Sequence, residues 1–442
     1  MRHPGPRRIA AALSCLALAA PVARADLIAA LDVAVSTGNL DLTRINATTG
    51  GVLTVPATVN TAANEVHPSF SPDGKRIAFL RRDSTGGTTR IIVVDLVSGQ
   101  SADLFSVFEA SADPPSTPVF SEDGTKILTG HPYNPTGSSG AQPSVVETAL
   151  ANFPNGPFPH TVVPVGGPVG TATTTSQPSV GAGGLLAFHI GGGGTDALVV
   201  RTTSDTAMIS AESARLVAPA IPRQGGSVVV FESIDSTNRH RLAFRPLDGA
   251  ASAPTTNLPA IVNARDTNAI KPAFSPDGRY LAFLRRPTTS STSGTRFFVL
   301  DTRTQLLLNP QGVPVTAPGN PDAISLQSTQ GGIDLFQSKV FFNTGLVSGV
   351  LTFGLVADSS VGIIVQRIVG MTRFLGRRVP KLRLVGRVPL GTFAGDATHE
   401  VAWNKKVDGK RLRRGRYLVT LRSITDDVQV RDLGEPVQIK IR

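Results

Sequence analysis

The stretch that decides the fold is HPSFSPDGKRIAFLRR at residues 67–82, because it recurs as KPAFSPDGRYLAFLRR at residues 271–286. A third copy, TPVFSEDG, occupies residues 117–124. Self-similarity of this kind within one chain indicates a repeat architecture, so the period of the repeat has to be established first.

Two weaker copies begin with QPSV at residues 177–180 and with APAI at residues 218–221, and a glycine pair and then an apolar run follow each of them. The repeated prolines are spaced 50, 60, 41 and 53 residues apart, at Pro68, Pro118, Pro178, Pro219 and Pro272. An interval of this size is typical of a four-stranded blade and not of a helical pair.

Each unit has the pattern of short strands joined by tight turns. Pro-x-Phe begins a first strand, where Pro is tolerated because no ladder donor is needed. Ser-Pro-Asp-Gly is a turn, and Ile-Ala-Phe is a second strand. We expect the aspartates Asp73, Asp123 and Asp277 to stabilise equivalent turns. We expect the arginine pairs Arg81-Arg82 and Arg285-Arg286 to act structurally against neighbouring turns.

One such sheet cannot bury both of its faces, whereas blades stacked around an axis cover one another. Five complete units and a partial unit at residues 27–50 therefore predict an all-β fold with a six-bladed β-propeller over residues 26–343. A late strand within residues 337–342 is expected to complete the first blade and close the ring.

The recurring Ser-Pro-Asp-Gly followed by Ile/Leu-Ala-Phe resembles the TolB-like, or WD40-like (PD40), β-propeller repeat of bacterial envelope proteins, over about residues 27–343. The resemblance implies the propeller fold. The family's functions vary, because TolB binds an outer-membrane lipoprotein while other members precede peptidase domains. The chain departs from TolB in having no α/β domain before the propeller and an extra domain after it.

Residues 344–442 show six short strand patterns, which predict a small β-sandwich. The segment VAWNKKVDGKRLRRGRY at residues 401–417 resembles the bacterial Ig-like domain of FlgD-type and other secreted proteins. We interpret Trp403 and Tyr417 as core anchors. Seven basic residues cluster around this hairpin, as a solvated face or as a site for an anionic envelope polymer: Lys405, Lys406, Lys410, Arg411, Arg413, Arg414 and Arg416.

The first 25 residues have the pattern of a secretory signal peptide. A basic start precedes an apolar run over residues 9–22, and small residues lie before Asp26. The alternative is a membrane anchor, but the run is shorter than the ~20 residues that a span needs. Cleavage would remove Cys15, the only cysteine, and would leave a secreted or periplasmic chain without a transmembrane span.

The charge is unevenly distributed along the chain. Residues 26–337 carry 20 basic and 24 acidic side chains, whereas residues 338–442 carry 19 basic and 8 acidic ones. Outside the cell, such a basic region favours an anionic cell-wall polymer or a membrane surface as its partner over nucleic acid.

No motif for nucleophilic, nucleotide-binding or metal chemistry is present, so we expect no catalytic residues, no cofactor and no metal. Because first strands line the channel of a propeller, the residues that enter them should meet at one mouth. These candidate partner-binding residues are Glu65, His67, Thr117, Gln177, Asn268 and Lys271.

We therefore interpret the chain as an exported, non-catalytic binding or scaffold protein that recruits a protein or glycan partner in the cell envelope. The alternative is a propeller enzyme, a lyase or glycosidase, that acts at the channel mouth with Glu65, His67 and Lys271. A purely structural surface protein is a third reading.

Overall fold

The structure is a computed structural model of the 442-residue chain. It describes residues 27–34, 39–46, 52–83, 89–104, 116–133, 142–164, 174–192, 195–202, 206–209, 214–223, 228–247, 255–275, 278–288, 295–314, 333–337, 345–347, 350–355, 358–375, 377–395, 397–425 and 430–441. The predicted signal peptide, residues 1–25, and the predicted domain boundary at 343/344 lie outside these ranges.

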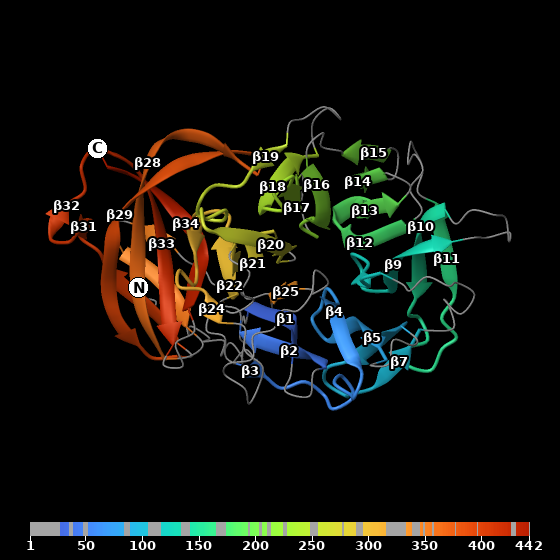
Figure 1. Cartoon of the computed structure of the whole chain (residues 1–442). Coiled ribbons are helices and arrows are strands. Elements are labelled where there is room, and N and C mark those ends of the chain that lie inside the picture. Colours follow the sequence, from blue (N-terminus) through green and yellow to red (C-terminus); the bar gives the residue numbers. More distant parts are fainter. Residues whose placement is uncertain are drawn as a thin grey trace, which may run out of the picture.

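Six antiparallel sheets are arranged in a ring in the described part of the first 337 residues, which is the arrangement of a β-propeller (Figure 1). Numbered along the chain and read from the innermost strand outward, blades 1 to 3 are β25 (Ile333–Gln337), β1 (Leu27–Ala34), β2 (Leu40–Asn46) and β3 (Val52–Leu53); β4 (Asn64–Phe70), β5 (Arg76–Arg82), β6 (Thr89–Asp95) and β7 (Ser101–Asp103); and β8 (Val119–Phe120), β9 (Lys126–Tyr133), β10 (Gln142–Ala149) and β11 (His160–Pro164).

Blades 4 to 6 are β12 (Thr174–Val180), β13 (Leu186–Gly192), β14 (Thr195–Arg201) and β15 (Thr206–Ile209); β16 (Ala214–Ala220), β17 (Val228–Asp235), β18 (His240–Pro246) and β19 (Thr256–Asn257); and β20 (Thr267–Phe274), β21 (Tyr280–Pro287), β22 (Arg296–Asp301) and β23 (Leu306–Leu307), with β24 (Val313–Pro314) also paired to β22. The described residues contain no α-helix, and hence no helix that could cross a membrane. The predicted all-β fold class is confirmed.

The side chains of strand β5 show how the blades stack, because those on its two faces pack against different neighbouring blades. In β5 successive residues point to opposite faces, as in any strand. Phe79 packs in a cluster with Leu42 of blade 1, whereas its neighbour Leu80 packs in a cluster with Phe120 of blade 3. Both faces of blade 2 are therefore buried against neighbouring blades, and all four residues from Ile77 to Leu80 are buried.

Equivalent aromatic residues occupy equivalent places around the ring. Each of Phe70, Phe120 and Phe274 ends the innermost strand of its blade and is at most 7% exposed. The second strands carry a further set of fully buried rings, at Phe79, Phe188, Phe231 and Phe283. Because a fully buried Phe contributes about 1.5–3 kcal/mol, this repeated ring supplies much of the driving force for stacking.

The ring closes through strand β25, which pairs with β1 from Leu27↔Gln337 to Leu31↔Ile333. The closing strand was expected within residues 337–342, so it begins four residues earlier than predicted. Residues 333–337 (IDLFQ) and 340–342 (VFF) both have strand composition. Pairing with β1, which lies some 300 residues away in the sequence, places residues 333–337 in the first blade.

The Ser-Pro-Asp-Gly turns have the predicted role where they are described. Asp73 accepts a hydrogen bond from the Ser71 hydroxyl (2.6 Å), and Asp123 accepts one from the Ser121 hydroxyl (2.6 Å). The bond from Ser121, followed by bonds from Thr125, holds the pKa of Asp123 below its ordinary value. The third aspartate, Asp277, lies outside the described residues.

The C-terminal residues form two sheets that share one core. One sheet is β26 (Gly345–Val347), β27 (Val350–Leu355) and β30 (Ala397–Ala402); the other is β29 (Arg377–Phe393), β28 (Ser359–Phe374), β33 (Gly415–Thr425) and β34 (Val430–Ile441). Phe353 of the first sheet and Val365 of the second lie in the same buried cluster, together with Trp403 and Tyr417. The two anchors are therefore core residues of a β-sandwich; its Ig-like assignment stays a prediction.

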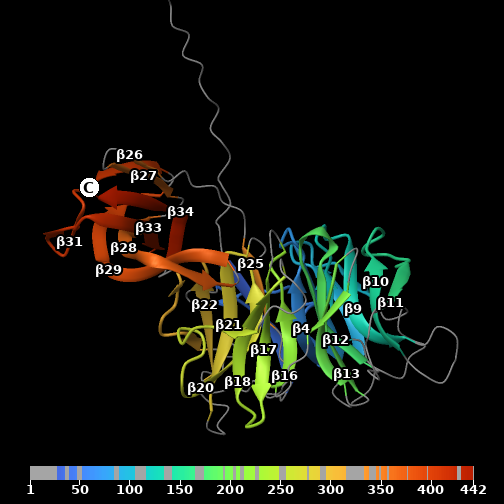
Figure 2. The ribbon, with the colours of Figure 1, turned by 90° about the horizontal axis from the view of Figure 1, so that it is seen from above.

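Strands β28 and β29 continue well beyond the sandwich and reach the propeller, as Figure 2 shows. At the tip of this hairpin, Phe374 and Leu375 are buried in a cluster that includes Phe298 of blade 6 and Leu258, which follows blade 5. The side chain of Gln366 donates to the Thr304 carbonyl (3.1 Å). The hairpin thus joins the two parts of the molecule through an apolar contact.

Candidate functional site

The innermost strands share a β-bulge at the repeated proline. The register shifts between Val66 and Ser69 in blade 2 and between Ile270 and Ala273 in blade 6, with equivalent shifts in blades 4 and 5. The residue before the proline has a positive φ at His67 (57°), Ala218 (49°) and Lys271 (53°). A bulge redirects a side chain, so this strained position aims His67 and Lys271 toward the centre of the ring.

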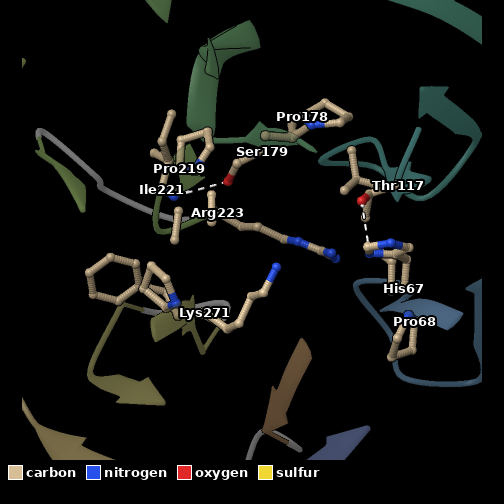
Figure 3. A pocket seen from close by; sticks show the side chains of 17 residues that line it. His67, Pro68, Thr117, Pro178, Ser179, Pro219, Ile221, Arg223 and Lys271 are labelled. Carbon is tan, nitrogen blue, oxygen red and sulfur yellow. Dashed lines mark hydrogen bonds between the residues drawn. The ribbon is translucent and has the colours of Figure 1, made fainter. Parts of the chain in front are cut away.

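A cavity of about 110 Å³ lies where these bulges converge (Figure 3). Five blades contribute to its wall through the bulges and the second halves of their innermost strands. Its ionisable lining residues are His67, Arg223 and Lys271, and no described Asp or Glu is among the residues that line it. Figure 3 shows the guanidinium of Arg223 and the amine of Lys271 both directed into the space between the blades.

Arg223 crosses the centre of the ring. It follows β16 in blade 5, and its Nη1 donates to the carbonyl of Phe70 in blade 2 (2.9 Å). Blades 2 and 5 are opposite one another in a six-membered ring, so this contact braces the channel across its width. Lys271 is held from the other side, because its backbone N–H donates to the buried carboxylate of Glu232 (3.2 Å).

The imidazole of His67 is neutral in this setting. Burial, and then the positive charges of Lys271 and Arg82, hold the pKa of His67 well below its usual range. Its Nδ1 lies 3.2 Å from the hydroxyl of Thr117. The cavity therefore has two cations, a neutral imidazole and three hydroxyl-bearing residues along its wall, Ser69, Thr117 and Ser179.

Ser69 is the one lining side chain whose polar atom is left unsatisfied among the described residues. It is 2% exposed, and its Oγ has no hydrogen-bond partner in the described part of the chain. A buried hydroxyl without a partner is destabilising, and native proteins rarely retain one without a reason.

The structure brings together only some of the predicted mouth residues. His67, Thr117 and Lys271 line the cavity. Glu65 does not: it is fully buried, and its carboxylate accepts from Arg81 Nε (2.9 Å) and from the Thr61 hydroxyl (2.6 Å).

Asn268 lies away from the cavity as well, because its Oδ1 accepts from the backbone N–H of His240 (3.1 Å). Gln177 belongs to β12, but its side chain lies outside the described part of the structure. The expectation that the six residues meet at one mouth is therefore wrong for Glu65 and Asn268. The cavity is built from the bulge onward and not from the residues that enter the strands.

Sequence reasoning missed Arg223 and Ser69. Arg223 stands where the fifth unit replaces Ser-Pro-Asp-Gly with Pro-Arg-Gln-Gly, so the departure from the repeat was the available signal. No sequence pattern marked Ser69 as a cavity residue, because a serine within a strand is common and does not by itself indicate a site.

Arg81 and Arg285 have the structural role expected of them. Arg81 Nη2 donates to the carbonyls of Thr58 and Val59 (both 2.9 Å). Arg285 donates through Nε to the Val262 carbonyl and through Nη2 to the Ile261 carbonyl, in the equivalent turn before blade 6.

A second cavity, of about 580 Å³, lies between blades 3 and 4. Its charged groups already have partners within the wall: Lys126 pairs with Glu147 (2.7 Å), and Asp123 belongs to the turn described above. The central cavity is therefore the better candidate for a binding site.

The basic hairpin residues of the C-terminal sandwich are all exposed. They surround strands β31 (Lys406–Val407) and β32 (Lys410–Arg411), at the end of the sandwich far from the propeller (Figures 1 and 2). The patch is thus separate from the central cavity. Across the described residues, no group of three or more His, Cys, Asp or Glu side chains could hold a metal ion.

No family model matches the chain, and no curated protein matches it. Among solved structures, it is similar to a protein described as TolB from Agrobacterium tumefaciens (10% identity, covering 72% of this chain and 99% of that one, TM-score 0.42). It is also similar to hydrazine synthase from Kuenenia stuttgartiensis (9%, 93% and 67%, 0.47) and to periplasmic gluconolactonase from Pseudomonas aeruginosa (16%, 85% and 99%, 0.39).

These similarities join proteins of different activity at low identity, and they assign no activity to this chain. The fold stands on the chain's own strand pairing: it is a β-propeller with a C-terminal β-sandwich.

Proposed function

We propose that this chain is an exported, non-catalytic binding protein of the TolB-like type, with an Ig-like C-terminal module, that recruits a protein or glycan partner in the cell envelope. The observation that carries the proposal is the central cavity, where Lys271 projects from the bulge of β20 and Arg223 from the turn that follows β16. Preformed sites with a few convergent polar groups are typical of ligand binding.

The catalytic alternative loses its best candidate in this arrangement. A lyase or glycosidase at the channel would need an acid or base directed at its substrate. Glu65, the carboxylate expected there, is engaged by Arg81 and Thr61 outside the cavity. Binding therefore accounts for more of the observed contacts than catalysis does.

The proposal is tested by immobilising the full-length protein and passing solubilised envelope fractions over it. We expect the wild type and Lys126→Gln, which removes a charge outside the central cavity, to retain the same partner. We expect Lys271→Gln to retain at least fivefold less of it. Equal retention by all three proteins would overturn the central cavity as the recruiting site, and shortened glycan products in the flow-through would favour the enzyme instead.

The basic hairpin supports a second, weaker contact with an anionic cell-wall polymer. Because its seven cations are exposed, their attraction should be screened as the Debye length falls from ~30 Å at 0.01 M salt to ~8 Å at 0.15 M. We expect the apparent affinity for such a polymer to fall at least tenfold between these conditions. A double substitution, Lys410→Gln with Arg411→Gln, should weaken the low-salt binding, and salt-independent binding would contradict the idea.

A further inference from the structure

We propose that the outer face of the long hairpin formed by β28 and β29 binds an anionic lipid surface. This face is separate from the central cavity and from the basic hairpin at residues 405–416, so the inference goes beyond the proposed function. The outer face carries Met371 and Arg373 on β28 and Arg378 and Leu384 on β29, and all four side chains are exposed.

The long hairpin turns one face to the propeller and the other to solvent. Beyond the end of β33, residues 368–374 of β28 pair with β29 alone and form a two-stranded arm. On one face of this arm, Phe374 and Val379 pack with the apolar cluster of blades 5 and 6. Because side chains alternate between the two faces of a strand, Arg373 and Arg378 lie on the opposite, outer face. The arm is fixed at its tip, so its outer face is held in one place (Figure 2).

Two arginines lie directly opposite one another on this arm. Arg373 is the cross-strand partner of Arg378, and the same arrangement recurs where Arg367 lies opposite Arg383. Like charges directly opposite one another destabilise an antiparallel pair. Neither strand contains an Asp or Glu, and within the described residues Arg373 and Arg378 have no ion-pair partner. A bound anion would relieve the repulsion, so the outer face favours a negatively charged partner.

Protection of a sheet edge accounts for only part of this pattern. β29 is the edge strand of its sheet, and cations on an edge strand hinder its pairing with another chain. That role requires neither two arginines in register nor exposed apolar side chains beside them. Yet these two strands carry four of the seven large apolar residues that are well exposed in the described part of the chain, namely Val369, Met371, Leu384 and Val385. Exposed apolar side chains grouped with charges indicate an interaction surface.

The apolar side chains identify the partner as a lipid surface. The register places Met371 and Leu384 on the same face as the Arg373–Arg378 pair. A soluble polyanion would meet the arginines and leave these two apolar side chains in water. A lipid surface offers anionic headgroups above an apolar phase, so it can meet both kinds of side chain at once.

Sedimentation with lipid vesicles tests the inference on the full-length protein. Vesicles of phosphatidylcholine mixed with phosphatidylglycerol supply the anionic surface, and vesicles of phosphatidylcholine alone are the uncharged comparison. We expect Arg373→Gln with Arg378→Gln to weaken binding to the anionic vesicles at least tenfold, because each cation near such a surface contributes about fivefold. Binding to phosphatidylcholine alone should not change. All of the proteins carry the same residues 1–25, so the differences between them report the substituted residues.

The matched control removes two exposed cations from the basic hairpin. Lys410→Gln with Arg411→Gln changes the net charge by the same amount and should weaken binding to the anionic vesicles less than threefold. Equal losses in the two double variants would assign the attraction to net charge and overturn the proposal.

A reversed charge separates lipid binding from folding. Arg378→Glu gives Arg373 an oppositely charged cross-strand partner, so the thermal midpoint should not fall. Binding to the anionic vesicles should nevertheless fall at least tenfold. Unchanged vesicle binding in this variant would sink the proposal.

The apolar residues distinguish a lipid surface from a soluble polyanion, for which polyglutamate is the probe. Met371→Ser with Leu384→Ser should weaken binding to the anionic vesicles at least fivefold and leave any binding to polyglutamate unchanged. The control, Val52→Ser with Val97→Ser, alters two exposed apolar residues of the propeller and should change neither. If Met371→Ser with Leu384→Ser bound the vesicles as well as the wild type does, the partner would be a soluble anionic chain and the lipid assignment would be wrong.

Discussion

Replacing Phe374 with alanine should destabilise the propeller, although Phe374 belongs to the C-terminal hairpin. Its side chain is 5% exposed and lies in a buried cluster that includes Phe298 and Leu258 and packs against Leu307, residues that belong to or border blades 5 and 6. Removing a buried Phe side chain typically lowers the free energy of unfolding by about 3–5 kcal/mol, because it leaves a cavity that the surroundings fill incompletely.

Two probes make this measurement informative. Trp403 is the only tryptophan and lies in the sandwich, so its fluorescence follows that part, whereas far-ultraviolet circular dichroism follows the whole chain. We expect the wild type to show coincident denaturant transitions and Phe374→Ala to show separated ones. The control is Met371→Ala in the same hairpin, which is 43% exposed and should change stability by at most ~0.5 kcal/mol. A loss below about 1 kcal/mol in Phe374→Ala would show that the tip does not stabilise the propeller.

Replacing Arg81 with methionine should be far more damaging than the same change at Arg285. Both arginines donate to two carbonyls of the preceding turn. They differ in their strand partner, which is Glu65 for Arg81 and Ala269 for Arg285. Arg81→Met therefore leaves a fully buried carboxylate without its cation, at about 3–5 kcal/mol. Arg285→Met loses hydrogen bonds from a charged donor, at about 1–3 kcal/mol.

A double variant separates the stability lost through the unpaired Glu65 carboxylate from the stability lost with the hydrogen bonds of Arg81 to the turn carbonyls. Glu65→Leu combined with Arg81→Met removes the stranded carboxylate, so its stability should return to within ~1 kcal/mol of Arg285→Met. Chemical denaturation at neutral pH measures all three proteins. If Arg81→Met and Arg285→Met lost the same stability, the Glu65 ion pair would contribute nothing specific.

The repeat in the sequence was sufficient to predict the stacked blades, because the same residues recur where the same contacts recur. Phe70, Phe120 and Phe274 are examples: each ends an innermost strand and is buried. Three of the predicted residues before the repeated prolines line the cavity for the same reason: His67, Thr117 and Lys271.

The sequence did not predict where the alternation of side chains between the two faces of a strand is broken, nor which distant residues each strand contacts. In an unbroken strand Glu65 and His67 would share a face, since they are two residues apart. The bulge between Val66 and Ser69 breaks that alternation: His67 is turned to the cavity, whereas Glu65, which precedes the bulge, stays opposite Arg81. The length of β28 and β29 escaped prediction similarly, because the apolar residues that cover their tip lie in blades 5 and 6, far upstream in the sequence.

The closure of blade 1 by β25 imposes an order on assembly. During synthesis, which starts at the N-terminus, β1 and β2 are made first. The inner edge of β1 has no neighbouring strand until residues 333–337 have been made. Until then β1 offers an unprotected edge of the kind that recruits strands from other molecules. The nascent protein must therefore be shielded until slightly more than three quarters of its length is free, and any shortened version intended for study has to retain the strand that ends at Gln337.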